Sequence, residues 1–115
     1  MPAPIYEVKA QFFKTLGHPA RIRVLEILRE GECSVAELRP RVGLEASHLS
    51  HQLAILRRAG VVRSRREGSS VLYSVTDRRV FDLLQVAKEI LTGALTGASA
   101  LAAELEALRF VDEQS

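Results

Sequence analysis

The sequence has 115 residues, of which 47% are hydrophobic and 26% are charged. This length predicts a single domain over residues 1–115, and the composition is that of a globular protein, which excludes a disordered or collagen-like chain. The one cysteine, Cys33, excludes an intramolecular disulfide. The N-terminus lacks the pattern of a signal peptide, and the uncharged stretch between Glu89 and Glu104 is too short and polar for a membrane span. We therefore expect a cytoplasmic protein with no membrane partner.

Charge is distributed unevenly along the chain. Residues 46–79 carry seven arginines against only Glu67 and Asp77, whereas residues 80–115 are net negative and residues 1–45 are nearly neutral. A basic middle segment indicates either a polyanionic partner or a solvated arginine-rich surface.

Apolar spacing and capping signals predict the elements in chain order. A helix spans Ile5 to Leu16 and ends at Gly17, and a second begins at Pro19 and stops at Gly31. Ser34 and Glu37 form a capping box that starts a third, short helix reaching about Val42. Pro40 is expected to bend or shorten that helix.

A turn at Gly43 leads to a fourth helix, which ends at Ala59-Gly60. Two strands follow, over 61–66 and 71–75, joined by a hairpin connection at 67–70. Thr76 or Asp77 caps a last helix that includes Val80 to Leu91, and the segment 101–110 is helical, either separate or continuous with it. The predicted fold is mainly α with a small β-hairpin, in which a helix-turn-helix followed by the hairpin forms a winged helix.

Four stretches of the sequence resemble the ArsR/SmtB family of bacterial winged-helix repressors. They correspond to the family's opening signature (13–25), its first motif helix (34–38), its recognition helix with the exit from it (47–53 and 56–62) and its wing (65–73). The family often has His where this chain has Gln52. The resemblance covers about Gln11 to Leu91 and implies a homodimer formed through the first and last helices.

The recognition helix offers short polar side chains that can approach base edges in the major groove. Gln52 is the best candidate for reading adenine, because its amide can donate and accept. The arginines after it are candidates for phosphate contacts, and the wing tip is a candidate for the backbone or the minor groove. The candidate DNA-binding residues are Ser47, His48, Ser50, His51, Gln52, Arg57, Arg63, Arg65, Arg66, Ser69 and Ser70.

Apolar residues outside the motif exceed what so small a domain can bury. We expect them to form a dimer interface, since one recognition helix with its wing covers little DNA and paired half-sites lie one turn apart. The alternative is that they complete the core of a monomer. The candidate interface residues are Ile5, Val8, Phe12, Leu83, Leu84, Ala87, Ile90 and Leu91.

Many relatives release DNA on binding a metal, and the resemblance places their ligands at known positions. Ser34 and Ala36 stand where one family site has cysteines. At the second family site, Asp77 matches the first ligand. The other ligand positions of that site hold Arg79, Ile90 and Gly93. Both sites are therefore broken. A non-standard nickel or zinc site stays open, while Cys33 is expected to be a small, partly buried residue and His18 a helix-start residue.

The sequence therefore predicts a DNA-binding transcriptional regulator, expected to be a repressor, that binds a palindromic operator as a homodimer and responds to an effector. Alternatives are an effector-independent or small-molecule-responsive regulator, and a dimeric protein-interaction module without DNA. No catalytic motif is present, so we expect no enzyme activity. The operator, the effector and the sign of regulation stay open.

Overall fold

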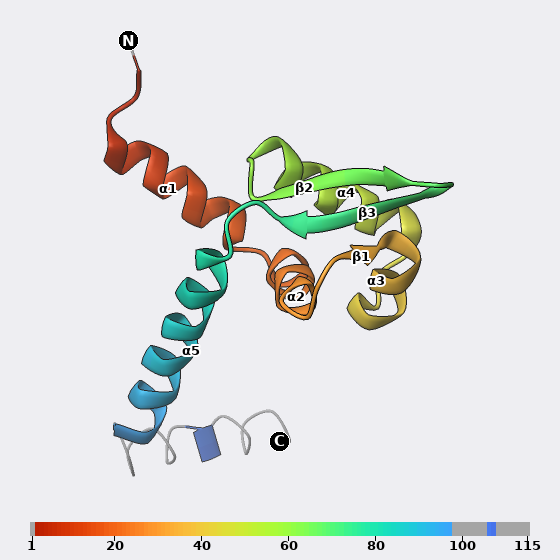
Figure 1. The fold of residues 1–115 in the computed structure, drawn as a ribbon. Coiled ribbons are helices and arrows are strands. Elements are labelled where there is room, and N and C mark those ends of the chain that lie inside the picture. The colour runs from red at the N-terminus through yellow and green to blue at the C-terminus, as the bar shows by residue number, and fades with distance from the viewer. Residues whose placement is uncertain (1, 98–105, 108–115) are drawn as a thin grey trace. The chain divides into compact units, whose positions relative to one another are not determined.

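The computed structural model describes residues 2–97 and 106–107. It contains two compact units, residues 1–81 and residues 82–115, each described by itself. The elements along the chain (Figure 1) are α1 (Ile5–Leu16), α2 (Pro19–Leu28), β1 (Cys33–Ser34), α3 (Val35–Val42), α4 (Ala46–Arg58), β2 (Val62–Glu67), β3 (Ser70–Val75) and α5 (Arg79–Gly97).

The boundary between α1 and α2 follows the predicted signals. Gly17 caps the C-terminus of α1, and Pro19 is the first residue of α2, where its missing N–H costs no helical hydrogen bond. His18 is the N-cap of α2, and its Nδ1 accepts a hydrogen bond from the Ala20 amide at 3.1 Å. The prediction that His18 starts a helix is therefore confirmed.

The capping box of α3 is present as predicted. The Ser34 hydroxyl accepts from the Glu37 amide at 3.2 Å, and the Glu37 carboxylate accepts from the Ser34 amide at 3.1 Å. Pro40 lies inside the helix, which nevertheless continues to Val42. The helix ends at Gly43, whose φ of 79° is a left-handed conformation that glycine adopts without a Cβ clash.

The core of the first unit lies where α2, α3 and α4 meet. Six of its eight largest fully buried side chains are leucine, which is consistent with the apolar spacing of the three helices. Each such side chain contributes roughly 1.5–3 kcal/mol by leaving water. The largest fully buried side chains are Val24, Leu25, Ile27, Leu28, Leu38, Leu49, Leu53 and Leu56.

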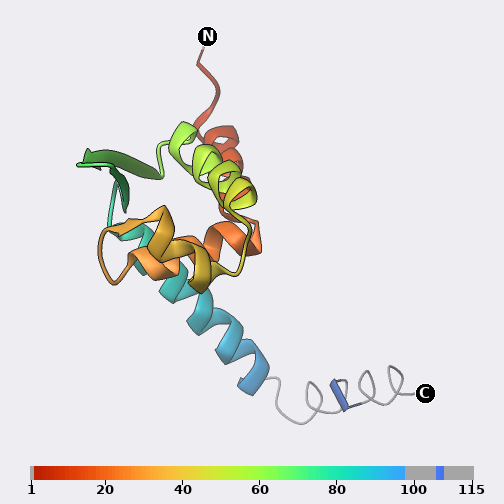
Figure 2. The same ribbon diagram turned by 90° about the vertical axis from the view of Figure 1, so that its right-hand side faces the viewer.

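The sheet has three antiparallel strands in the order β1-β3-β2. The β2–β3 hairpin was predicted, whereas β1 was not. The hairpin connection is shorter than predicted, because Glu67 pairs with Ser70 and leaves only Gly68 and Ser69 as the turn. Gly68 has a φ of 62°, which suits a two-residue hairpin turn. Figure 2 shows the hairpin projecting to one side of the helices of this unit.

The last described helix, α5, begins after Asp77, as predicted. The Asp77 carboxylate accepts from the Arg79 amide at 2.9 Å and so satisfies a donor of the first turn. The helix continues through Gly93 to Gly97 without a break. The predicted helical segment 101–110 lies outside the described residues except for 106–107. No helix in the described ranges is long and apolar enough to cross a membrane.

Candidate nucleic-acid interface

Helices α3 and α4, joined by a turn at Gly43, form the helix-turn-helix, and α4 presents a polar face. Leu49, Leu53 and Leu56 are completely buried and fix the inner side of α4 against the core. Four of the predicted contact residues lie on the outer side of α4 and are exposed. These are Ser47, His48, Ser50 and His51.

Gln52 differs from its neighbours, because it is half-buried at the edge of the inner face of α4. Its side-chain oxygen accepts a hydrogen bond of 3.0 Å from the guanidinium of Arg21, which belongs to α2. The structure thus places the residue that was predicted to read adenine in a contact with another helix. The contact between Arg21 and Gln52 was not predicted from the sequence.

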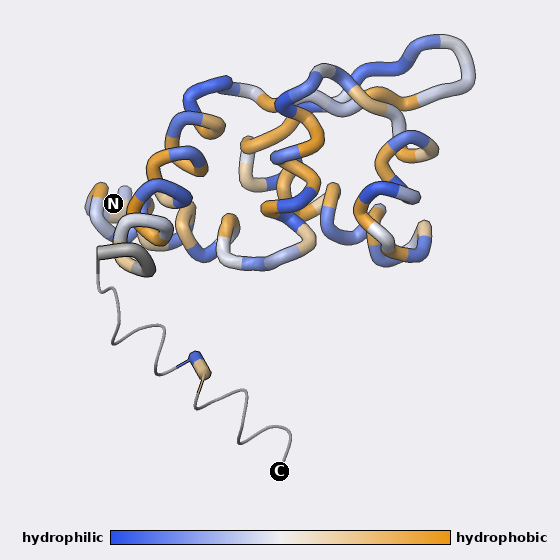
Figure 3. The backbone as a smooth tube through the Cα atoms, turned by 90° about the horizontal axis from the view of Figure 1, so that it is seen from below, coloured by the Kyte–Doolittle hydropathy of each residue, from blue (hydrophilic) through white to orange (hydrophobic). Residues whose placement is uncertain are grey.

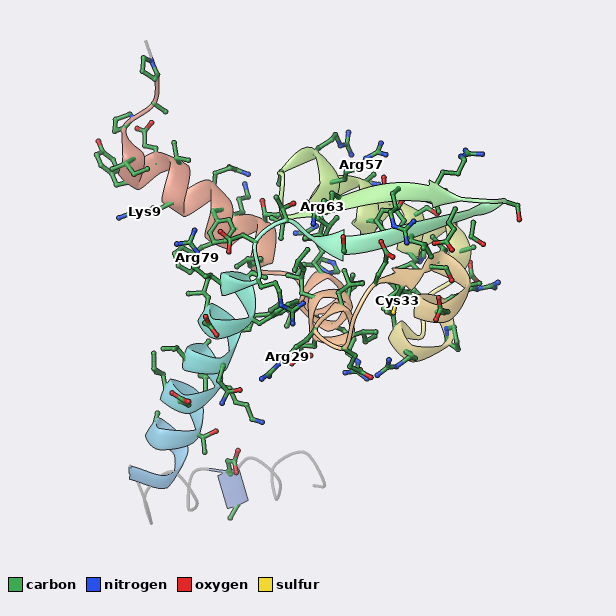
Figure 4. The ribbon with its side chains drawn as sticks, in the orientation of Figure 1. Lys9, Arg29, Cys33, Arg57, Arg63 and Arg79 are labelled. Carbon is green, nitrogen blue, oxygen red and sulfur yellow. The ribbon has the colours of Figure 1, made fainter. Side chains whose placement is uncertain are left out.

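The basic end of α4 is exposed. Figure 4 shows Arg57 at the C-terminal part of α4 and Arg63 near the start of β2, both well back from the hairpin tip. The Nε of Arg58 donates to the Ala54 carbonyl at 3.3 Å, which holds that side chain along its own helix. These arginines lie beside the polar face of α4 and are available to an anion.

The wing arginines divide between the two faces of the hairpin. Side chains alternate along a strand, so Arg63 and Arg65 share one face of β2 while Arg66 lies on the other with Val62. Ser69 and Ser70 are exposed at the tip. In Figure 3 one strand of the hairpin has hydrophilic colours, the tip is pale, and the other strand includes hydrophobic colours.

Arg65 is held by two carboxylates. Its Nε and one terminal nitrogen donate to Glu32 at 2.7 and 2.6 Å, and that terminal nitrogen also donates to Glu67 at 2.7 Å. These contacts raise the pKa of Arg65, the hydrogen bonds that it donates to Glu32 most strongly, and Arg65 lowers the pKa of Glu32 in turn. The three formal charges sum to −1, so this cluster presents negative rather than positive charge to its surroundings.

The candidate interface residues of α1 and α5 are largely open to solvent. Ile5 is 67% exposed, and Ile90 and Leu91 are each 64% exposed. Val8, Phe12 and Ala87 are exposed as well, while Leu83 and Leu84 are half-buried. Ile5, Val8 and Phe12 recur at helical spacing and share a face of α1, as Leu83, Ala87 and Ile90 do on α5. Tyr6, which was not predicted, is also an exposed apolar side chain.

The side chains at the family's metal-ligand positions do not make up either of its metal sites. Of the positions that the resemblance gives to the family's ligands, only Asp77 carries a metal-binding group. The others hold Ser34, Ala36, Arg79, Ile90 and Gly93, none of which offers a thiolate, imidazole or carboxylate. Within the described part of the chain, no group of three or more His, Cys, Asp or Glu side chains could hold a metal ion.

Cys33 lies in β1 opposite Tyr73 and is buried. Burial raises the pKa of its thiol and so disfavours the thiolate that binds metals or reacts.

The sequence and the fold are similar to those of known proteins. Residues 18–64 match the family model described as "Bacterial regulatory protein, arsR family". The chain is 50% identical over 105 residues to the "Uncharacterized HTH-type transcriptional regulator Rv0081" of Mycobacterium tuberculosis, covering 90% of this chain and 92% of that protein. A crystal structure of Rv0081 has a TM-score of 0.78 at 51% identity and covers 86% of this chain and 100% of that one.

Two further proteins extend the likeness. The "Biofilm growth-associated repressor" of Agrobacterium fabrum is 36% identical over 89 residues, which cover 74% of this chain and 76% of that protein. The homodimeric winged helix-turn-helix DNA-binding domain Mb0332 of Mycobacterium bovis has a TM-score of 0.69 at 27% identity, covering 77% of this chain and 85% of that one. The motif residues, the fold and these relatives lead to one conclusion: the chain belongs to the ArsR family of bacterial transcriptional regulators.

Proposed function

We propose that the protein is a repressor that binds a palindromic operator as a homodimer. The observation that carries this proposal is the division of α4 into a fully buried leucine face and an exposed polar face, next to a hairpin that projects beside it. A helix of this kind fits the major groove, and its short serine side chains allow close approach to the bases.

Affinity is supplied mainly by arginines around that helix. Arg57, Arg63 and Arg66 are exposed, and no carboxylate in the described residues forms an ion pair with them. Their charge is therefore available to the phosphate backbone, which supplies binding energy and orientation but no sequence choice. Ser69 and Ser70 at the wing tip contact the backbone or the minor groove.

A second copy of the chain covers the apolar faces of α1 and α5. Exposed apolar side chains gathered on one face of a helix mark an interaction surface, and the Mycobacterium bovis relative is homodimeric by its description. A dimer also explains how a protein of 115 residues reaches two successive major-groove segments.

An effector that releases the DNA is a further part of the proposal. A nickel or zinc site needs ligands beyond the family's usual ones, since Asp77 is the one metal-binding side chain at those positions. An apolar molecule held between subunits is an alternative that fits the exposed faces of α1 and α5.

The test is a mobility-shift titration of the purified protein on DNA from upstream of its own gene. We expect a retarded complex that competitor DNA of unrelated sequence does not remove. The titration is repeated with Ni²⁺, with Zn²⁺ and with a chelator. Loss of the complex only with a metal supports a metal sensor, and an unchanged complex in all three argues against one. Absence of any sequence-dependent complex would overturn the proposal.

A further inference from the structure

One guanidinium connects three helices of the first unit. Arg21 lies in the first turn of α2 and is partly buried. Its Nε donates to the Thr15 carbonyl at 2.6 Å, and its NH1 donates to the Oε1 of Gln52 at 3.0 Å. Thr15 belongs to the last turn of α1, where carbonyls have no partner within the helix and attract a cation. Arg21 is therefore anchored at α1 and directed at α4.

The chemistry of this pair fixes which way the Gln52 amide points. A guanidinium has five N–H donors and no acceptor, so only the oxygen of a carboxamide can face it. The Nε2 group of Gln52 must then point away from Arg21. No buried side-chain nitrogen or oxygen in the described residues lacks a hydrogen-bond partner. The Nε2 group has no hydrogen-bond acceptor among the residues that the structure describes, so it is accessible to solvent and its N–H groups are free to donate.

This orientation changes what Gln52 can read. Pairing with adenine uses both edges of the carboxamide, because the oxygen accepts from N6 and the nitrogen donates to N7. With its oxygen held by Arg21, Gln52 directs its N–H donors outward. Guanine presents two neighbouring acceptors in the major groove, N7 and O6, and no donor there.

We propose that Arg21 is a specificity-determining positioning residue that turns Gln52 into a hydrogen-bond donor for guanine. The inference rests on the proposed function, because it requires α4 to enter a major groove. It also revises the adenine preference expected for Gln52 from sequence. Arg21 acts through Gln52 and touches no base itself.

The experiment is selection from a pool of duplexes with randomised half-sites, followed by affinity measurements on single-base variants. Gln52→Met identifies the position that Gln52 reads, since this variant loses preference there. We expect the unchanged protein to favour guanine at that position by about tenfold over adenine. Arg21→Met frees the amide to rotate and is expected to remove that preference or shift it to adenine, while preferences at the other positions persist.

Two variants separate positioning from folding. Gln52→Glu keeps an oxygen facing Arg21 but has no N–H, so it should lose the guanine preference without a fall in Tm. Arg23→Met is the matched control, since Arg23 is an exposed arginine of the same helix with no hydrogen bond to α4 among the described contacts. It should leave every base preference unchanged.

Three results would overturn the inference while leaving DNA binding intact. The first is a guanine preference that survives Arg21→Met, and the second is a preference for adenine in the unchanged protein. The third is a Gln52→Met variant that weakens binding to all sequences equally, which would make Gln52 a backbone contact. A protein that selects no sequence at all would instead refute the proposed function, and this inference with it.

Discussion

The guanidinium of Arg65 on the wing donates two hydrogen bonds to the carboxylate of Glu32, at 2.7 and 2.6 Å. Glu32 immediately precedes β1, and β3 lies between β1 and β2 in the sheet. The pair therefore links the edge strand β2 to the residue that precedes the opposite edge strand, β1. A two-pronged, charge-assisted contact of this kind fixes geometry as well as charge. Arg65 is therefore better described as a brace of the wing than as a free phosphate contact.

This relationship gives a prediction that contrasts neighbouring arginines. Because Arg65 is neutralised by Glu32 and Glu67, Arg65→Ala should leave the salt dependence of DNA binding nearly unchanged. Arg66→Ala should reduce the slope of log K against log salt by about 0.9 per lost phosphate contact, or about 1.8 for a dimer. Fluorescence anisotropy between about 50 and 200 mM salt measures both slopes. Equal slope changes in the two variants would show that Arg65 exchanges its carboxylates for phosphate.

A second prediction concerns the apolar face of α5. Ile90 is 64% exposed in the single chain, so an aspartate there costs little in a monomer but places a charge in the proposed dimer interface. Ile90→Asp should therefore sediment as a monomer at micromolar concentrations where the unchanged protein is a dimer. Its affinity for a two-half-site operator should fall with the loss of the dimer.

The matched control for that variant is on the same helix. Glu89 shares a face with Asp82 and Gln85, outside the apolar face and about 100° around the helix axis from Ile90. Glu89→Lys reverses a charge without touching the apolar face and should remain dimeric. If Ile90→Asp also remains dimeric, the proposed role of α5 in the interface is wrong.

A third prediction follows from the start of α5. The guanidinium of Arg79 and, less strongly, its backbone amide donate to Asp77 and lower the pKa of that carboxyl from 3.8 to about 2. Because the pKa is lower in the folded state than in the unfolded state, the stabilisation is complete above about pH 4 and is lost as the pH falls through about 2.

Asp77→Asn removes this titration but keeps an oxygen that can accept from the Arg79 amide. Its Tm should be below that of the unchanged protein at about pH 7, and the difference should shrink towards about pH 2.5. Thermal unfolding at a fixed protein concentration measures the difference. A gap that is equally wide at both pH values would mean that the charge of Asp77 does not contribute.

A fourth prediction tests the capping box of α3. Ser34→Ala removes the acceptor for the Glu37 amide and should destabilise the protein by about 1 kcal/mol, lowering the Tm by a few degrees. Ser34→Thr retains a hydroxyl and should restore most of the loss. If the alanine variant has the same Tm as the unchanged protein, water hydrogen-bonds to the Glu37 amide as well as the Ser34 hydroxyl does.

Local signals predicted much of the fold, and for a physical reason. Ser34 and Glu37 are three residues apart, as a capping box requires, and the leucines of α4 recur at helical spacing, so both patterns are visible in a short window of sequence. Pro40 does not shorten α3, since the helix reaches Val42, the predicted end.

Contacts between distant parts of the chain could not be predicted. The strand β1 has only two residues, and it exists because Cys33 and Ser34 pair with Tyr73 and Leu72. The bond from Arg21 to Gln52 likewise joins residues 31 positions apart, and that from Arg65 to Glu32 joins residues 33 apart. No local pattern marks such pairs, so the sequence indicated which elements carry the interface but not which of their side chains are already engaged.

The central claim is that α4 and the wing bind a specific duplex, and its most direct test is equilibrium binding to a selected operator. A fluorescent duplex with two half-sites about 10 base pairs apart is titrated with protein, beside a scrambled duplex of equal length. We predict at least a thousandfold tighter binding to the operator, on the order of specific regulators. His51→Ala should reduce that ratio. Equal affinity for the two duplexes would contradict the account.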